Sequence, residues 1–240
     1  MTRSVLGASY RILRDDLWRF LLLTGVAVVP LNAAQSFAPG RWRDLPFYLA
    51  VIGYPLAQAA VADAVRERQT RPEVSIRSYL RIAPRFMALA FASIAGYVGI
   101  FVGLFLLIVP GLLAIARWSV FVPVIVNEQE LKIGIGPLAR SNHLVRGNTW
   151  TGFSIFLLPL LPMIVISLPN LALHSLALAW LAIALSPLVA SYGGIAAAVF
   201  YERLTHDPLL QPERPTLPIP GTEEPPPSAA EAARRRLWKP

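Results

Sequence analysis

Long runs of apolar residues, separated by short polar segments, dominate this sequence of 240 residues. A helix needs about 20 mainly apolar residues to cross the hydrocarbon core of a bilayer. Runs near this length cover residues 17–38, 47–65, 86–109, 112–127, 150–169 and 175–203. The pattern predicts an all-α integral membrane protein, with six transmembrane helices in a domain of residues 1–204.

The polar segments that precede the first and fifth runs have an amphipathic pattern. Residues 1–20 alternate arginines with leucine, isoleucine and valine, and residues 128–149 also mix charged and apolar positions. Such patterns are typical of helices that lie in the membrane interface. A signal peptide is the alternative interpretation of the first run, but Asp15 and Asp16 precede that run and further spans follow it. An uncleaved first helix is therefore favoured.

The composition supports the membrane interpretation. Hydrophobic residues make up 55% of the chain and charged residues 15%, and the mean hydropathy is +0.53. Soluble domains carry about 25% charged residues, so this chain has too little charge to cover a water-facing surface. Residues 205–240 are rich in proline, glutamate and alanine and are predicted to form a disordered cytoplasmic tail.

The distribution of basic residues predicts the topology. The net charge is +8 and the isoelectric point about 10.4, which we interpret as contact with anionic lipid headgroups at the cytoplasmic face rather than with nucleic acid. Lysines and arginines number four in residues 1–20, six in 66–85, three in 128–149 and six in 203–240, against two in 39–46. The positive-inside rule then places both termini in the cytoplasm. A re-entrant 112–127 segment is the alternative.

Two polar segments match in register, residues 9–18 and 141–150. Serine, arginine and tryptophan coincide in the pairs Ser9/Ser141, Arg14/Arg146 and Trp18/Trp150. Residues 78–82 match them more loosely. We interpret these segments as three copies of a unit of about 66 residues, each an interfacial helix followed by a helical hairpin. Chance similarity is the alternative, since Arg and Trp are common at membrane interfaces.

Small residues recur every fourth position in the third run, at Ala88, Ala92 and Gly96, and again at Gly99 and Gly103. This spacing lets another helix approach closely. Packing within the chain is favoured over a dimerisation site.

Arg117 is the most unusual residue of the apolar runs. Pro110 and Gly111 are predicted to form a tight turn before the fourth span, which places Arg117 about 10 Å along that helix at 1.5 Å per residue. A charge at that depth needs a partner, water or a path to the headgroups. It is therefore either a site for an anion or lipid headgroup, or a structural arginine. Glu128 is expected to end a helix and pair with basic residues.

Catalytic and metal-binding patterns were not found in the sequence. The chain contains no cysteine, and its three histidines are far apart. No nucleophile–base pair, phosphate-binding loop or dinucleotide motif is present. We therefore expect no enzymatic activity, no bound metal and no cofactor.

The stretch around Arg117 resembles the membrane domain found fused to some glycerophosphodiester phosphodiesterases, and related stand-alone bacterial membrane proteins. The matching positions are Pro110–Gly111, Arg117–Trp118, Pro123–Val124–Ile125–Val126, Glu128 and residues 141–148. The resemblance implies a six-span domain in the bacterial cytoplasmic (inner) membrane. No phosphodiesterase domain accompanies it, so that activity is not expected.

These positions supply the candidate site. The binding candidates are Arg117, Trp118, Glu128, Arg146 and Asn148. The structural candidates are Pro110, Gly111, Pro123, Ser141 and Gly147.

Two functions remain open from the sequence. The first is transport or handling of an anion or phospholipid, with Arg117 facing a cavity. The second is a non-catalytic membrane scaffold or accessory subunit that binds lipid, a partner protein or a second copy of the chain.

Overall fold

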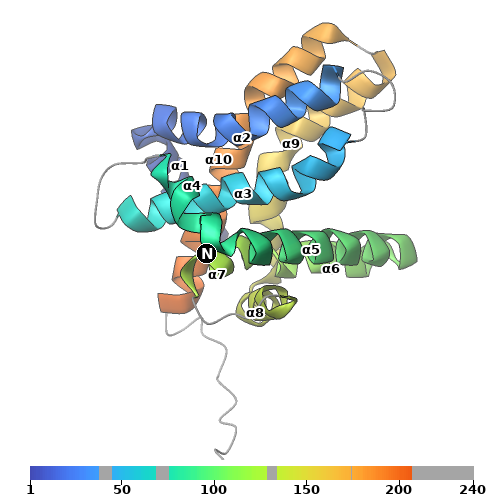
Figure 1. Ribbon diagram of the computed structural model, residues 1–240. Coiled ribbons are helices and arrows are strands. Elements are labelled where there is room, and N and C mark those ends of the chain that lie inside the picture. Colours follow the sequence, from blue (N-terminus) through green and yellow to red (C-terminus); the bar gives the residue numbers. More distant parts are fainter. Residues whose placement is uncertain (38–44, 69–75, 129–133, 174, 207–240) are drawn as a thin grey trace, which may run out of the picture.

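The computed structural model describes residues 1–37, 45–68, 76–128, 134–173 and 175–206 (Figure 1). Every regular element in these ranges is helical. The predicted tail 205–240, apart from its first two residues, and most of the predicted loop 39–46 lie outside the described residues.

The long helices follow the apolar runs of the sequence and come in consecutive pairs. They are α2 (Leu17–Phe37) with α3 (Leu45–Arg68), α5 (Phe86–Leu106) with α6 (Ile108–Arg117), and α9 (Thr149–Leu173) with α10 (Leu176–His206). A short helix, α7 (Phe121–Asn127), follows α6 in the chain.

A shorter helix precedes each pair. These helices are α1 (Thr2–Asp15), α4 (Arg77–Ile82), which continues into the 3-10 turn η2 (Ala83–Arg85), and α8 (Gly136–Val145). The polar segments before the first, third and fifth runs therefore do form helices.

Five helical segments of the described chain are long and apolar enough to cross a membrane. They are Leu17–Phe37, Arg77–Leu106, Ile108–Asn127, Thr149–Ile166 and Leu176–His206. The second predicted span corresponds to α3, which has 24 residues but is not one of the five. Its C-terminal half carries Gln58, Asp63 and Arg66, whose polar side chains lower its hydropathy. The described part is thus all-helical, with several helices suited to a membrane.

The predicted turn at Pro110–Gly111 is wrong. The chain reverses at Leu107, which takes an extended conformation with φ −159° and ψ 130°, and α6 begins at Ile108. Pro110 and Gly111 lie in the first turn of α6. Proline is tolerated there because the first amide groups of a helix have no acceptor within the helix.

The predicted helix 112–127 is not continuous, although the segment Ile108–Asn127 that contains it is long and apolar enough to cross a membrane. The chain turns at residues 118–120, between α6 and α7. Pro123 has no N–H to donate to the carbonyl of Ser119, so the helical hydrogen-bond pattern is interrupted at that point. The Phe121 amide instead bonds to the Trp118 carbonyl three residues back, at 3.2 Å.

The hydrophobic core lies around the C-terminal halves of α3 and α10 and around α7. Continuous buried stretches occupy residues 59–65 of α3, 122–126 of α7 and 194–201 of α10. Phe20 from α2 and Phe200 from α10 are the largest fully buried side chains. A buried hydrogen bond of 2.9 Å between the hydroxyls of Thr24 and Ser191 adds a polar link between α2 and α10.

Each helix pair packs on the next one in the chain, and the third pair packs on the first. α3 packs on α5, α6 packs on α9, and α10 returns to pack on α2. Figure 1 shows α5 and α6 side by side, extending away from the α9–α10 pair, with α1, α4 and α7 gathered at the opposite end. The pairs therefore converge near the short helices and diverge away from them.

The small residues of α5 lie at the contacts that hold its neighbours. A Cβ on Gly103 would lie 3.0 Å from the Cα of Gly111, and one on Gly99 would lie 2.6 Å from the Trp118 ring. Gly96 faces Leu138 of α8. The expected packing within the chain is confirmed at these positions.

Candidate functional site

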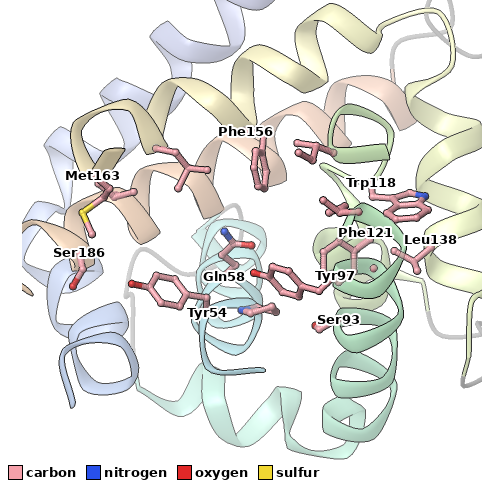
Figure 2. Close-up of a pocket in the computed structure, with 16 residues that line it drawn as sticks. Tyr54, Gln58, Ser93, Tyr97, Trp118, Phe121, Leu138, Phe156, Met163 and Ser186 are labelled. Carbon is pink, nitrogen blue, oxygen red and sulfur yellow. The ribbon is translucent and has the colours of Figure 1, made fainter. Parts of the chain in front are cut away.

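A cavity of about 340 Å³ lies between the diverging helix pairs (Figure 2). We call it the inter-hairpin cavity. Its lining comes from α3, α5, α6, α9 and α10, with contributions from the 118–120 turn, α7 and α8. Its volume is within the range of small-molecule binding sites, about 300–1,000 Å³.

The lining is mainly apolar and aromatic, and none of the residues that form it is charged. It consists of Tyr54, Pro55, Gln58, Ser93, Gly96, Tyr97, Ile100, Ile115, Trp118, Phe121, Leu138, Phe156, Leu160, Met163, Ser186 and Val189. An apolar ligand segment fits such a surface, whereas a bare anion finds no balancing charge there.

Some polar groups of the lining are already bonded within the protein. The hydroxyl of Tyr54 exchanges hydrogen bonds with the side-chain amide of Asn32, at 2.8 and 3.1 Å. Ser93 donates to the Leu89 carbonyl, and Ser186 donates to the Ile183 carbonyl.

Two polar groups of the lining differ from these. Within the described chain, neither the amide of Gln58 nor the hydroxyl of Tyr97 has a hydrogen-bond partner. Figure 2 shows both side chains directed into the pocket, Gln58 from α3 and Tyr97 from α5. The inter-hairpin cavity therefore offers two free hydrogen-bonding groups on an apolar wall.

Arg117 is the last residue of α6, and its side chain is not part of the cavity lining. Its Nε is buried without a hydrogen-bond partner among the described residues, and its backbone carbonyl accepts a bond of 2.8 Å from the hydroxyl of Ser141. Counted from Ile108, it lies about 14 Å along α6 rather than 10 Å. The adjacent Trp118 does line the cavity.

Glu128 forms an ion pair away from the cavity. Arg140 of α8 donates from Nε to its carboxylate at 3.0 Å, and the Tyr201 hydroxyl donates to the same group at 3.3 Å. The expectation that Glu128 ends a helix and pairs with a basic residue is confirmed, because α7 ends at Asn127. This pair ties α7, α8 and α10 together.

Arg146, Gly147 and Asn148 form the turn between α8 and α9. Gly147 has φ +94°, a conformation that a side chain disfavours. The Asn148 carbonyl accepts the first helical bond of α9, from Gly152 at 3.1 Å, and Arg146 is exposed. Arg146 and Asn148 do not line the cavity.

Two further structural candidates, Ser141 and Pro123, are buried. Ser141 is fully buried and bonds to Arg117, as described above. Pro123 is buried in α7, and its carbonyl accepts a hydrogen bond from the Asn127 amide at 2.8 Å.

Sequence reasoning found one lining residue, Trp118, and missed Gln58 and Tyr97. A signal for Gln58 was present, because an amide in the middle of an apolar run needs a polar partner. No such signal marked Tyr97, since tyrosine is common in transmembrane helices near the interface. The described residues also contain no group of three His, Cys, Asp or Glu side chains placed to hold a metal ion.

Comparison of the chain with protein-family models, curated proteins and solved structures gives no significant match.

Proposed function

We propose that this chain is a six-span protein of the bacterial cytoplasmic membrane that handles a phospholipid by holding an acyl chain in the inter-hairpin cavity. The observation that supports this proposal is the cavity itself, which is uncharged, mainly apolar and lined by residues from all three helix pairs. For the purified protein, each methylene that the cavity shields from water contributes about 0.8 kcal/mol. In the bilayer, where lipid tails are equally apolar, binding of the acyl chain rests on van der Waals contacts and on the polar groups of the wall.

The six-span arrangement adds α3 to the five segments named above, one of which is the combined α6–α7 segment. In this proposal α1, α4 and α8 lie at the cytoplasmic interface, where arginines meet anionic headgroups. The opposite ends of the long helices would face the outside.

The three-copy repeat is part of the same proposal. Ser9, Ser78 and Ser141 are each fully buried. The next long helix starts eight residues after each serine, at Leu17, Phe86 and Thr149. One residue further on, the side chains of Trp18, Met87 and Trp150 are largely exposed, at 75%, 66% and 81%. This agreement in burial and in helix start supports a unit, an interfacial helix followed by a hairpin, that occurs three times in the chain.

Arg117 is proposed to meet the phosphate of the lipid headgroup. Its buried Nε has no partner among the described residues, and Trp118 connects it to the cavity wall. A guanidinium is suited to phosphate because its planar donors match the phosphate oxygens. The resemblance to the phosphodiesterase-associated membrane domain stays a prediction.

Filling the cavity tests the proposal. Val189→Trp would place an indole among the lining residues, whereas Val98→Trp makes the same change on an α5 position that is 56% exposed. Native mass spectrometry of the purified protein, titrated with a phospholipid, measures the affinity. Loss of two buried methylenes corresponds to about tenfold weaker binding for Val189→Trp, and Val98→Trp is expected to match the parent.

Equal lipid binding by a folded Val189→Trp protein would contradict the proposal and favour the scaffold function. The role of Arg117 has a separate test. Arg117→Ala should lower the preference for anionic over zwitterionic phospholipids, whereas Arg117→Lys, which keeps the positive charge, should largely preserve it. An unchanged preference in Arg117→Ala would make Arg117 a structural residue.

A further inference from the structure

The free amide of Gln58 and the free hydroxyl of Tyr97 need a partner that the described part of the protein does not supply. In a membrane interior, an unpaired polar group is unfavourable by several kilocalories per mole. Both groups lie on the wall of the inter-hairpin cavity, one from α3 and one from α5 (Figure 2). A ligand in the cavity is the natural source of that partner.

The chemistry of the wall limits what this partner can be. No lysine, arginine or histidine lines the cavity, so a phosphate placed there would lack a balancing charge. Gln58 offers N–H donors and Tyr97 an O–H donor, and a carbonyl oxygen has two lone pairs to accept from both. The remaining lining suits a hydrocarbon chain attached to that carbonyl.

Resting on the proposed function, we propose that Gln58 and Tyr97 bind the ester carbonyl that joins an acyl chain to the lipid glycerol. The chain then occupies the apolar part of the cavity. The charged headgroup stays outside the cavity, so Gln58 and Tyr97 distinguish lipids by the linkage of the acyl chain.

The test compares an ester-linked phospholipid with its ether-linked analogue of the same chains and headgroup. Native mass spectrometry of the full chain gives the affinity for each. The parent is expected to bind the ester lipid about tenfold more tightly, because the ether lacks the carbonyl acceptor. Gln58→Leu and Tyr97→Phe should each reduce this preference, and the double variant should abolish it.

Tyr192→Phe is the matched control. Tyr192 does not line the cavity, and its hydroxyl donates to the Leu6 carbonyl at 3.4 Å, so its removal should leave the ester preference unchanged. Thermal unfolding of each variant checks that it is folded.

The outcomes separate this inference from the proposed function. Equal affinity of the parent for ester and ether lipids would overturn the ester site while leaving acyl-chain binding in place. The same holds if Gln58→Leu and Tyr97→Phe keep the full preference. Failure of the parent to bind either lipid would overturn both proposals.

Discussion

Arg81 holds the short helix α4 against α3 through two carboxylates. Its Nε donates to Asp63 at 2.9 Å, and its Nη2 reaches Glu67. Asp63 is only 7% exposed, so Arg81 replaces the water that would otherwise solvate its carboxylate. The pair places Asp63 in a structural role, and the sequence alone did not connect these two residues.

Replacing Arg81 tests this dependence. Arg81→Ala leaves Asp63 buried without its partner and should lower the free energy of unfolding by about 2 kcal/mol, less than for a fully buried pair because Arg81 is partly exposed. The double variant Arg81→Ala/Asp63→Asn removes the unpaired charge and should recover part of the loss. Thermal unfolding of the detergent-solubilised protein followed by circular dichroism measures both. Equal loss in the single and double variants would argue against a buried charge as the cause.

At the scale of helices, glycine decides how closely elements meet. Gly152, in the first turn of α9, lies against the turn that follows α6. A Cβ there would be 2.4 Å from the Ala116 carbonyl oxygen and 2.9 Å from the Ser119 hydroxyl. The nearest of these atoms belongs to the backbone of α6, so a side chain at Gly152 forces α6 and α9 apart.

Gly152→Ala is therefore expected to lower the free energy of unfolding by about 1–3 kcal/mol, the usual result of overpacking. Gly7 is the matched control, because a Cβ there meets nothing within 4 Å. Gly7→Ala should instead stabilise helix α1 by about 0.5–1 kcal/mol. Both changes are measured by thermal unfolding in the same detergent, and a Gly152→Ala protein as stable as the parent would show that α6 and α9 are not in close contact.

At the scale of the whole molecule, the ion pairs and the most exposed apolar side chains lie at different ends. The ion pairs of Arg68, Arg81 and Arg140 lie near α1, α4 and α8. The ends of α5 and α6 that extend away from these helices expose Phe105 to 92% and Val109 to 74%. Such apolar surface is unfavourable in water and is covered by lipid in a bilayer. The positive-inside rule predicts that the charged end faces the cytoplasm.

The natural lack of cysteine makes this orientation testable. Single cysteines at Ala139, exposed on α8, and at Ser175, between α9 and α10, would lie on opposite sides of the membrane. A membrane-impermeant maleimide should label Ser175→Cys in intact cells and Ala139→Cys only after lysis. Labelling of Ala139→Cys in intact cells would place α8 outside and make the α6–α7 segment re-entrant.

The sequence by itself determined the helices and their approximate ends. Apolar runs, polar segments and prolines act within a few residues, so α2, α5, α9 and α10 begin within about a residue of their predicted positions. The short helices α1 and α8 also follow from the local amphipathic pattern, and α4 from the loose match of residues 78–82 to the other two segments. The same reasoning misplaced the turn before α6 because Pro110 and Gly111 are compatible both with a turn and with the first turn of a helix.

Only the tertiary structure decided which side chains meet. Most sides of a membrane helix are apolar, so no polar stripe reveals the inward face, as it does in a soluble protein. Gln58 and Tyr97 come together in the inter-hairpin cavity because α3 and α5 pack against each other, although the two residues lie far apart in the chain. Arg117 was visible in the sequence, but its position beside the cavity depends on the break after α6 and on the packing of α8 and α9 around it.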